Sequence, residues 1–269
     1  MSNLSVESSG HGPPLVLLHG WAMHSGLWGP MVSHLAQTRR VHAVDLPGHG
    51  CSAPRSLRDP PYTLDAIVAA VDTALAGEAQ PLAVVGWSLG GLVAMRWALT
   101  RPERVDRLAL VCTTPRFVAS KGERDSEDWP HAMSAATLAR FGDELHVAWK
   151  LTVQRFLALQ VHNSDHGRAT LAAMREQLWA RGEPAPAVLA ETLDVLRTTD
   201  LREDVPRIIQ PTLVVTGGRD TLAWPAAGCW LAGAIPGAAL HEIGGAAHAP
   251  FLSHRDEFLG VLGSFLDAG

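Results

Sequence analysis

A serine in this sequence stands in a setting that suits nucleophilic catalysis. Ser88 lies in the stretch Gly86-Trp87-Ser88-Leu89-Gly90, between an apolar run typical of a buried strand and a pattern typical of a helix. A Gly-x-Ser-x-Gly sequence between strand and helix is typical of a nucleophile elbow, a sharp turn that exposes a hydroxyl at the end of a sheet. The same residues also fit a tight turn that happens to contain a serine. The pattern therefore needs support from the rest of the chain.

A serine hydroxyl is a poor nucleophile unless a base takes its proton and a third group orients that base. The acid that best fits is Asp220, in TGGRDTLAWP, directly after the apolar run PTLVV. An aspartate at this position is equally consistent with a turn residue or a helix N-cap. The sequence alone leaves both interpretations of Asp220 open.

The base that best fits is His248, in GGAAHAPFLSH, after the last strand-like run. The chain holds 13 histidines, so position has to discriminate among them. His254 lies at a predicted helix start, and His11, His19 and His42 precede the serine. The order serine, acid, histidine is that of the α/β hydrolases. We therefore expect His248 to be the base.

Acyl transfer by serine also needs backbone N–H groups that stabilise an oxyanion, and loss of one such donor typically costs about 2.7–4 kcal/mol. We expect these donors at Leu89, after the nucleophile, and at Trp21, in the loop LLHGWAMHSGLW. The pair His19-Gly20 also fits a simple turn at a strand end. Trp21 and Trp87 also fit plain core residues, or walls of a narrow acyl slot.

Composition limits the classes of protein to consider. A chain of 269 residues with 47% hydrophobic and 18% charged residues can bury one large α/β core. A net charge of −5 argues against a nucleic-acid binder. The three cysteines lack metal-ligand spacing. The first residues lack the features of a signal peptide, and no apolar run reaches the roughly 18 residues that span a bilayer. We expect a cytoplasmic protein that binds neither membrane nor nucleic acid.

Short apolar runs alternate with helical patterns along most of the chain. Continuous apolar runs are typical of parallel strands covered on both faces, so we expect a doubly wound, mostly parallel sheet. Predicted strands are 14–20, 40–48, 81–87, 105–113, 211–218 and 238–245. Predicted helices between them are 25–37, 64–76, 89–100, 224–233 and 255–267.

This alternation stops from residue 116 to about residue 197, where three helices fit better than strands. Asp143 can cap a helix that runs to Val161, and Asp165 can cap another that ends near Gly182. A third helix begins at Pro184 or Pro186 and runs through Leu196. An insertion here would lie over the carboxyl edge of the sheet, where open α/β sheets bind ligands.

Several of these motifs together resemble one family. The segments LVLLHGW, VDLPGHG, GWSLGGLVA, RFLALQ, LRTTDLRED and HAPFLSH are similar to those of the pimeloyl-[acyl-carrier protein] methyl ester esterases of biotin synthesis, the BioH family. The resemblance runs through nearly the whole chain. It implies an α/β-hydrolase core in residues 1–115 and 198–269, with a helical lid in 116–197. It also implies that Ser88, Asp220 and His248 form the triad.

The resemblance implies further site residues. Substrate contacts are expected at Trp21, Ser88, Leu89, His248 and along Phe156, Leu157, Ala158, Leu159 and Gln160. On a helix Phe156 and Leu159 share one face, where they could line an acyl channel or simply pack the lid.

Family substrates are attached to an acidic carrier protein through phosphopantetheine, and basic lid residues meet that partner. Between Leu145 and Gly182 the chain has five basic residues against two acidic ones. Carrier contacts are expected at Lys150, Arg155, Arg168 and Arg175. The chain departs from the family pattern at Leu151 and Ala172, where other lid arginines are expected.

The sequence therefore predicts a serine carboxylesterase, expected to be a monomer, that cleaves the methyl ester of pimeloyl-acyl-carrier protein and needs no metal or organic cofactor. Alternatives with the same triad are a broader carboxylesterase or thioesterase acting on short acyl esters, or a C–C bond hydrolase. A catalytically silent binding protein of the same fold is a further alternative, because fold alone does not fix function.

Overall fold

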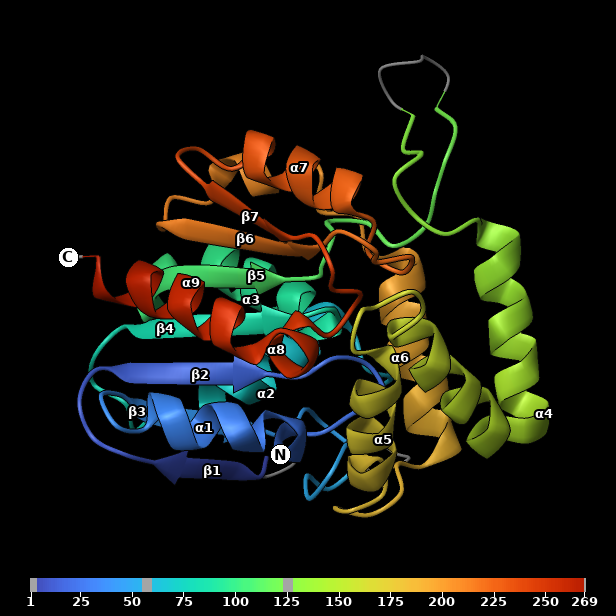
Figure 1. Ribbon diagram of the computed structural model, residues 1–269, viewed down its shortest axis with the longest axis horizontal. Coiled ribbons are helices and arrows are strands. Elements are labelled where there is room, and N and C mark those ends of the chain that lie inside the picture. The colour runs from blue at the N-terminus through green and yellow to red at the C-terminus, as the bar shows by residue number, and fades with distance from the viewer. Residues whose placement is uncertain (1–3, 55–59, 123–127, 269) are drawn as a thin grey trace.

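The computed structural model describes residues 4–54, 60–122 and 128–268. Its centre is a seven-stranded sheet in the order β1-β3-β2-β4-β5-β6-β7 (Figure 1). Strand β1 pairs antiparallel with β3, and the other neighbours pair in parallel. The strands are β1 Val6–Ser9, β2 Pro14–Leu18, β3 Arg40–Val44, β4 Leu82–Trp87, β5 Val105–Val111, β6 Thr212–Gly217 and β7 Ala239–Ile243. This is the architecture of an α/β hydrolase, as the sequence predicted.

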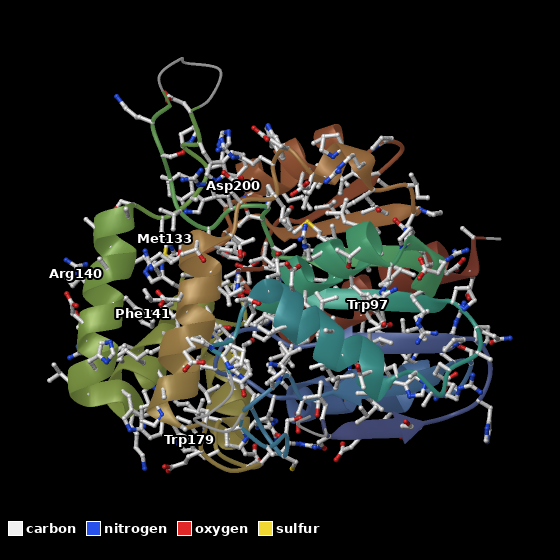
Figure 2. The ribbon with its side chains drawn as sticks, turned by 180° about the vertical axis from the view of Figure 1, so that it is seen from behind. Trp97, Met133, Arg140, Phe141, Trp179 and Asp200 are labelled. Carbon is white, nitrogen blue, oxygen red and sulfur yellow. The ribbon has the colours of Figure 1, made fainter. Side chains whose placement is uncertain are left out.

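Helices on both faces of the sheet explain why its central strands are continuous apolar runs. Every residue of β2, β4 and β6 is buried. Helices α1 and α9 cover one face, whereas α2 and α3 cover the other (Figures 1 and 2). The helices of this core are α1 Gly29–Leu35, α2 Leu64–Ala74, α3 Leu89–Thr100, α7 Pro225–Ala234, α8 Pro250–Ser253 and α9 Arg255–Asp267.

The predicted strands all occur, with ends at most two residues shorter than predicted, except for β3, which ends at Val44, four residues before the predicted end. The antiparallel strand β1 was missed. Its sequence, VESS, is polar and mostly exposed, because it forms an edge of the sheet and has no buried face to mark it as a strand. Within the described residues, no helix is long and apolar enough to cross a membrane.

The segment 116–197 lies between β5 and β6, and its described residues form three α-helices beyond the carboxyl ends of the parallel strands (Figure 1). They are α4 Ala135–Gln160, α5 Gly167–Gln177 and α6 Pro186–Thr198. We refer to these three helices and their connections as the inserted helices.

Two predicted helix starts in this segment were wrong. Helix α4 begins at Ala135 rather than near Asp143, because the Ser134 side chain accepts from the Thr137 N–H and caps it there. The helix then kinks at Ala148, whose φ of −148° is not helical. Helix α5 follows His166, so Asp165 lies just before the helix and does not cap it.

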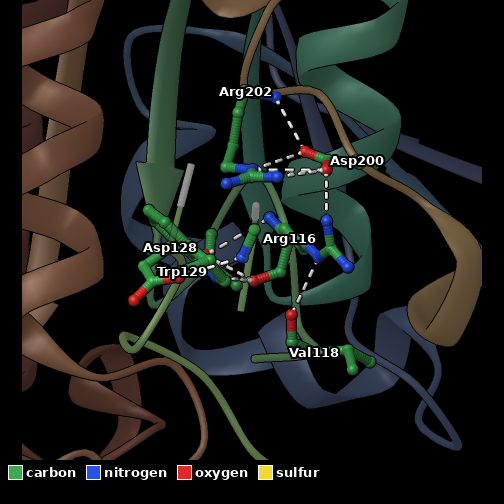
Figure 3. A network of polar contacts seen from close by, with 8 residues as sticks. Arg116, Val118, Asp128, Trp129, Asp200 and Arg202 are labelled. Carbon is green, nitrogen blue, oxygen red and sulfur yellow. Dashed lines mark hydrogen bonds and ion pairs between the residues drawn. The ribbon is translucent and has the colours of Figure 1, made fainter. Parts of the chain in front are cut away.

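A polar network fixes the inserted segment to the core where the chain leaves and re-enters it (Figure 3). Arg116 Nη1 lies 2.6 Å from Asp200 Oδ2, and Arg202 binds the same carboxylate at 2.8 Å. The Arg202 guanidinium also lies 5.7 Å from the ring centroid of Trp129, whose indole N–H donates to the Arg116 carbonyl. The main-chain N–H of Leu201 donates to the Pro115 carbonyl at 3.0 Å. The segment that leaves the core and the segment that re-enters it are therefore bonded directly to each other.

Candidate active site

Ser88 occupies a strained turn between β4 and α3. Its φ of 56° lies in the left-handed region that non-glycine residues rarely adopt. The turn is tight because a Cβ on Gly86 would lie 2.4 Å from the Gly90 carbonyl oxygen, and one on Gly90 would lie 2.3 Å from the Leu18 carbonyl oxygen. Both glycines of the Gly-x-Ser-x-Gly pattern are therefore required by close backbone approach.

The three residues predicted to act together meet at this turn. Ser88 Oγ lies 3.0 Å from His248 Nε2, and His248 Nδ1 lies 2.7 Å from Asp220 Oδ2. A carboxylate only accepts, so Nδ1 carries the proton and Nε2 is free to accept from the Ser88 hydroxyl. All three side chains are buried, from loops that follow β4, β6 and β7. The arrangement can transfer a proton from serine to histidine.

Neighbouring groups fix the orientation of the acid and the base. The main-chain N–H groups of Leu222 and Ala223 donate to Asp220 Oδ1 at 2.8 and 3.1 Å, which leaves Oδ2 for the histidine. The indole N–H of Trp87 donates to the His248 carbonyl at 2.7 Å, and the two rings lie 5.6 Å apart. Trp87 thus helps to fix the loop that follows β7 and carries His248, which we call the base loop.

The backbone segments expected to supply oxyanion donors lie next to the serine. Leu89 is the first residue of α3, and the first N–H groups of a helix have no partner within that helix. A Cβ on Gly20 would lie 3.2 Å from the Ser88 Cβ, so the main chain before Trp21 passes close to the hydroxyl. Trp21 itself is buried, and its indole N–H donates to the Leu189 carbonyl in α6 at 3.0 Å.

An aromatic cluster joins Trp21 to the inserted helices. The ring centroid of Trp21 lies 5.5 Å from that of Phe141 and 5.1 Å from that of Phe156, both in edge-to-face geometry. Figure 2 shows Phe141 on α4, with Arg140 on the outer side of the same helix. The sequence did not single out Phe141. Its approach to Trp21 depends on the kink at Ala148, which folds the first half of α4 back onto the second and which no sequence pattern predicts.

A hollow of about 280 Å³ lies between the two halves of α4. Phe156 and Leu159 both line it, as their spacing on one helix face predicts. The remaining lining residues are Thr137, Arg140, Phe141, Glu144, Thr152 and Arg155.

Comparison with known proteins identifies the family. Residues 13–255 match the family model of the alpha/beta hydrolase fold. The chain is 44% identical over 264 residues to the pimeloyl-[acyl-carrier protein] methyl ester esterase of Xanthomonas axonopodis pv. citri, covering 98% of each chain. It is 42% identical over 265 residues to the protein of the same name from Chromobacterium violaceum, again covering 98% of each. The chain belongs to this esterase family.

Solved structures agree on the fold. An esterase from Exiguobacterium antarcticum superposes with a TM-score of 0.86 at 20% identity, covering 99% of this chain and 96% of the other. A hydrolase from Pseudomonas aeruginosa PA01 superposes with a TM-score of 0.80 at 28% identity, covering 99% and 95%.

The residues of the segment 156–160, where the family resemblance implies substrate contacts, differ in burial. Leu157 is fully buried among the inserted helices, whereas Ala158 and Leu159 are exposed. Gln160 is buried, and both polar atoms of its side-chain amide lack a hydrogen-bond partner among the described residues. Its main-chain carbonyl accepts from the His248 N–H at 3.0 Å. Gln160 is thus bonded to the loop of the histidine.

The basic residues expected to contact a carrier protein differ in whether they already form salt bridges within the chain. Lys150 binds Glu183 at 2.6 Å, and Arg155 lies 3.7 Å from Glu144. Arg168 and Arg175 are exposed on α5. Arg181, which adds to the basic count in the sequence, turns inward to Glu7 and Asp45 and does not contribute to the outer face.

Cys112 is a neighbour of the acid that the sequence did not connect with the site. Its Sγ lies with the ligand atoms of Asp220 and His248 in a group whose members are within 4.8 Å of one another. Burial, followed by the negative charge of Asp220, raises the pKa of the Cys112 thiol well above its usual value. These are the described residues that could hold a soft metal ion, but Asp220 and His248 already bond each other. The absence of a metal stays a prediction.

Proposed function

We propose that this chain is a serine carboxylesterase of biotin biosynthesis that hydrolyses the methyl ester of pimeloyl-acyl-carrier protein to pimeloyl-acyl-carrier protein and methanol. The observation that carries the proposal is the chain of hydrogen bonds from Ser88 through His248 to Asp220. The printed names of relatives that match 98% of the chain support the choice of substrate. The triad alone would serve many acyl substrates.

In the proposed mechanism, His248 Nε2 takes the Ser88 proton as Oγ attacks the ester carbonyl. The N–H groups of Leu89 and Trp21 stabilise the oxyanion, and Asp220 stabilises the imidazolium that forms. His248 then returns the proton to the departing methoxide, which leaves as methanol. It next takes a proton from water, whose oxygen attacks the acyl-serine, and finally returns the proton to Ser88. The free carboxylate stays on the carrier.

The inserted helices serve in this proposal as the lid, residues 116–197, over a core made of 1–115 and 198–269. Phe156 and Leu159 would contact the acyl chain because they line the hollow in α4. Trp21 would contact it because its ring packs on that of Phe156. Leu157 and Ala158 contribute through the helix that carries them. Gln160, with its unpartnered buried amide, would bond a polar group of the substrate.

We further propose that the enzyme acts as a cytoplasmic monomer and takes its substrate from an acidic carrier protein. Arg168 and Arg175 are the exposed cations best suited to the carrier, because their positions seven residues apart lie on one face of α5. Lys150 and Arg155 would first have to leave Glu183 and Glu144.

The experiment that tests the proposal compares the hydrolysis of methyl pimeloyl-carrier protein with that of a short p-nitrophenyl ester that has no carrier. We expect methanol release from the carrier substrate with a much higher kcat/KM, and its loss in Ser88→Ala. Ser253→Ala is the matched control, because this hydroxyl bonds the Ala249 carbonyl and His254 Nδ1 rather than a residue of the triad. Equal kcat/KM for carrier-bound and free esters would favour a broad carboxylesterase. No hydrolysis and no labelling of Ser88 by a fluorophosphonate would favour a binding protein.

A further inference from the structure

The connection between α4 and α5, residues 160–166, is hydrogen-bonded to the loop that carries His248. The His248 N–H donates to the Gln160 carbonyl, and the Asp165 N–H donates to the Gly245 carbonyl, each at 3.0 Å. Two bonds a few residues apart fix the base loop along the connection. This connection is part of the inserted helices, whereas the base loop belongs to the core.

Arg219, the residue before Asp220, binds both partners of this contact. Its main-chain N–H donates to the Ala246 carbonyl in the base loop at 2.9 Å. Its guanidinium donates to the Asn163 carbonyl at 2.7 Å and pairs with the Asp165 carboxylate. Arg219 lies in the loop that follows β6 and carries Asp220, which we call the acid loop. It therefore bonds the acid loop to the base loop through its main chain and to the inserted helices through its side chain.

Two glycines allow these segments to approach so closely. A Cβ on Gly217, at the end of β6, would lie 2.0 Å from the Ala247 carbonyl oxygen. A Cβ on Gly245 would lie 2.2 Å from the Asp165 carboxylate. The connection takes its own sharp turn at Asn163, whose φ is 63°. The acid loop, the base loop and the α4–α5 connection thus form one packed, hydrogen-bonded unit.

We propose that Arg219 is a positioning residue that couples the inserted helices to the triad, an inference that rests on the proposed hydrolysis at Ser88. Arg219 does not touch the serine. It acts through the Asp165 and Asn163 contacts, which hold the base loop at the distance where His248 reaches both Asp220 and Ser88. Its side chain is 43% exposed, and exposed ion pairs contribute little to global stability. The effect of losing it should therefore appear in catalysis more than in folding.

The test measures kcat and KM for a short p-nitrophenyl ester, and the rate of Ser88 labelling by a fluorophosphonate, in Arg219→Ala. Neither reagent needs a carrier protein. We expect kcat and the labelling rate to fall together by about tenfold, since misplacement of catalytic groups by a fraction of an ångström is costly. KM and the melting temperature should change little. Arg219→Lys, which keeps a cationic donor, should recover part of the rate.

The matched control is Arg207→Ala, which removes an exposed arginine that pairs with Asp204 away from the site. It should leave kcat unchanged. Asp165→Asn should lower kcat in the same direction as Arg219→Ala, and the double variant should be no slower than Arg219→Ala alone, because both changes break one contact.

Unchanged kcat in Arg219→Ala, additive losses in the double variant, or a loss of activity matched by a fall in melting temperature would each overturn the inference. If the unsubstituted protein itself neither hydrolyses the ester nor reacts with the fluorophosphonate, the proposed function fails and not only this coupling.

Discussion

The main-chain N–H of His248 donates to the carbonyl oxygen of Gln160 across 3.0 Å. This bond joins the histidine of the triad to the last residue of α4, so the inserted helices and the catalytic loop are one unit at this point. A movement of α4 that admits a substrate toward Ser88 must either carry the His248 loop with it or break this bond. The position of the base and the position of α4 are therefore linked.

The acid should matter through the tautomer of the histidine. In Asp220→Asn the amide oxygen can still accept from the Leu222 and Ala223 N–H groups, which directs the NH₂ group toward His248 Nδ1. The proton then moves to Nε2, which can no longer accept from Ser88. We expect kcat to fall by about 10³- to 10⁴-fold with an unchanged fold. Steady-state kinetics and circular dichroism check this, and a loss below tenfold would show that Asp220 does not orient the base.

Adjacent residues of α4 should have separable effects. Phe156→Ala removes the ring that packs on Trp21, and we expect a higher KM for long acyl esters with little change for acetate. Leu157→Ala empties a fully buried site, and we expect it to lower the free energy of unfolding by about 2–5 kcal/mol with KM unchanged. Urea denaturation and a series of p-nitrophenyl esters measure both. The opposite assignment of effects would contradict the proposed acyl contact.

Charge reversal on α5 should affect only the carrier-bound substrate. In Arg168→Glu/Arg175→Glu we expect KM for methyl pimeloyl-carrier protein to rise about tenfold or more, since complementary charge guides such encounters. The difference from the unsubstituted enzyme should shrink in high salt. Arg197→Glu on α6 is the control, because this exposed arginine pairs locally with Asp194. An equal rise in KM for a short ester would place the effect in folding or chemistry instead.

Acid should destabilise the protein through buried histidines. Burial lowers the pKa of His19 to about 3 and that of His49 to about 4, far below the usual 6.5. The unfolded chain therefore binds more protons below pH 6.5, so stability is complete above that pH and is lost as the pH falls toward 4 and then 3. Each histidine contributes up to about 1.4 kcal/mol per pH unit in this range.

Urea denaturation between pH 7 and pH 4.5 measures this slope. His49 Nδ1 donates to the Pro47 carbonyl at 3.0 Å, and an asparagine can keep that donor without titrating. We expect His49→Asn to reduce the slope by about one proton. His146→Asn, at an exposed position of α4, is the control for the substitution itself. An unchanged slope in His49→Asn would mean that this histidine is not held neutral by its surroundings.

Features that depend on local sequence could be predicted well. The strands β2 to β7 follow from apolar runs, and the turn at Ser88 follows from glycines whose place is fixed by backbone approach. The order of Ser88, Asp220 and His248 follows from the chain alternation, because each lies after a parallel strand and these ends share one edge of the sheet.

Features that depend on contacts between distant segments could not be predicted. The kink at Ala148 brings Phe141 to Trp21 only in the folded chain. The sequence did not connect Cys112 with the site, because its nearness to Asp220 depends on the pairing of β5 with β6. Arg181 belongs to the basic count in sequence but binds Glu7 of the edge strand, which the sequence did not reveal.

We propose that Ser88 carries out hydrolysis of a carrier-bound methyl ester. The most direct measurement is the mass of the acyl group on the carrier after incubation of methyl pimeloyl-carrier protein with the enzyme, or with Ser88→Ala. We expect the enzyme to convert the ester completely to the free ω-carboxylate, with the thioester to the carrier intact, and the variant to convert none. An intact methyl ester with the enzyme, or equal conversion by Ser88→Ala, would contradict it.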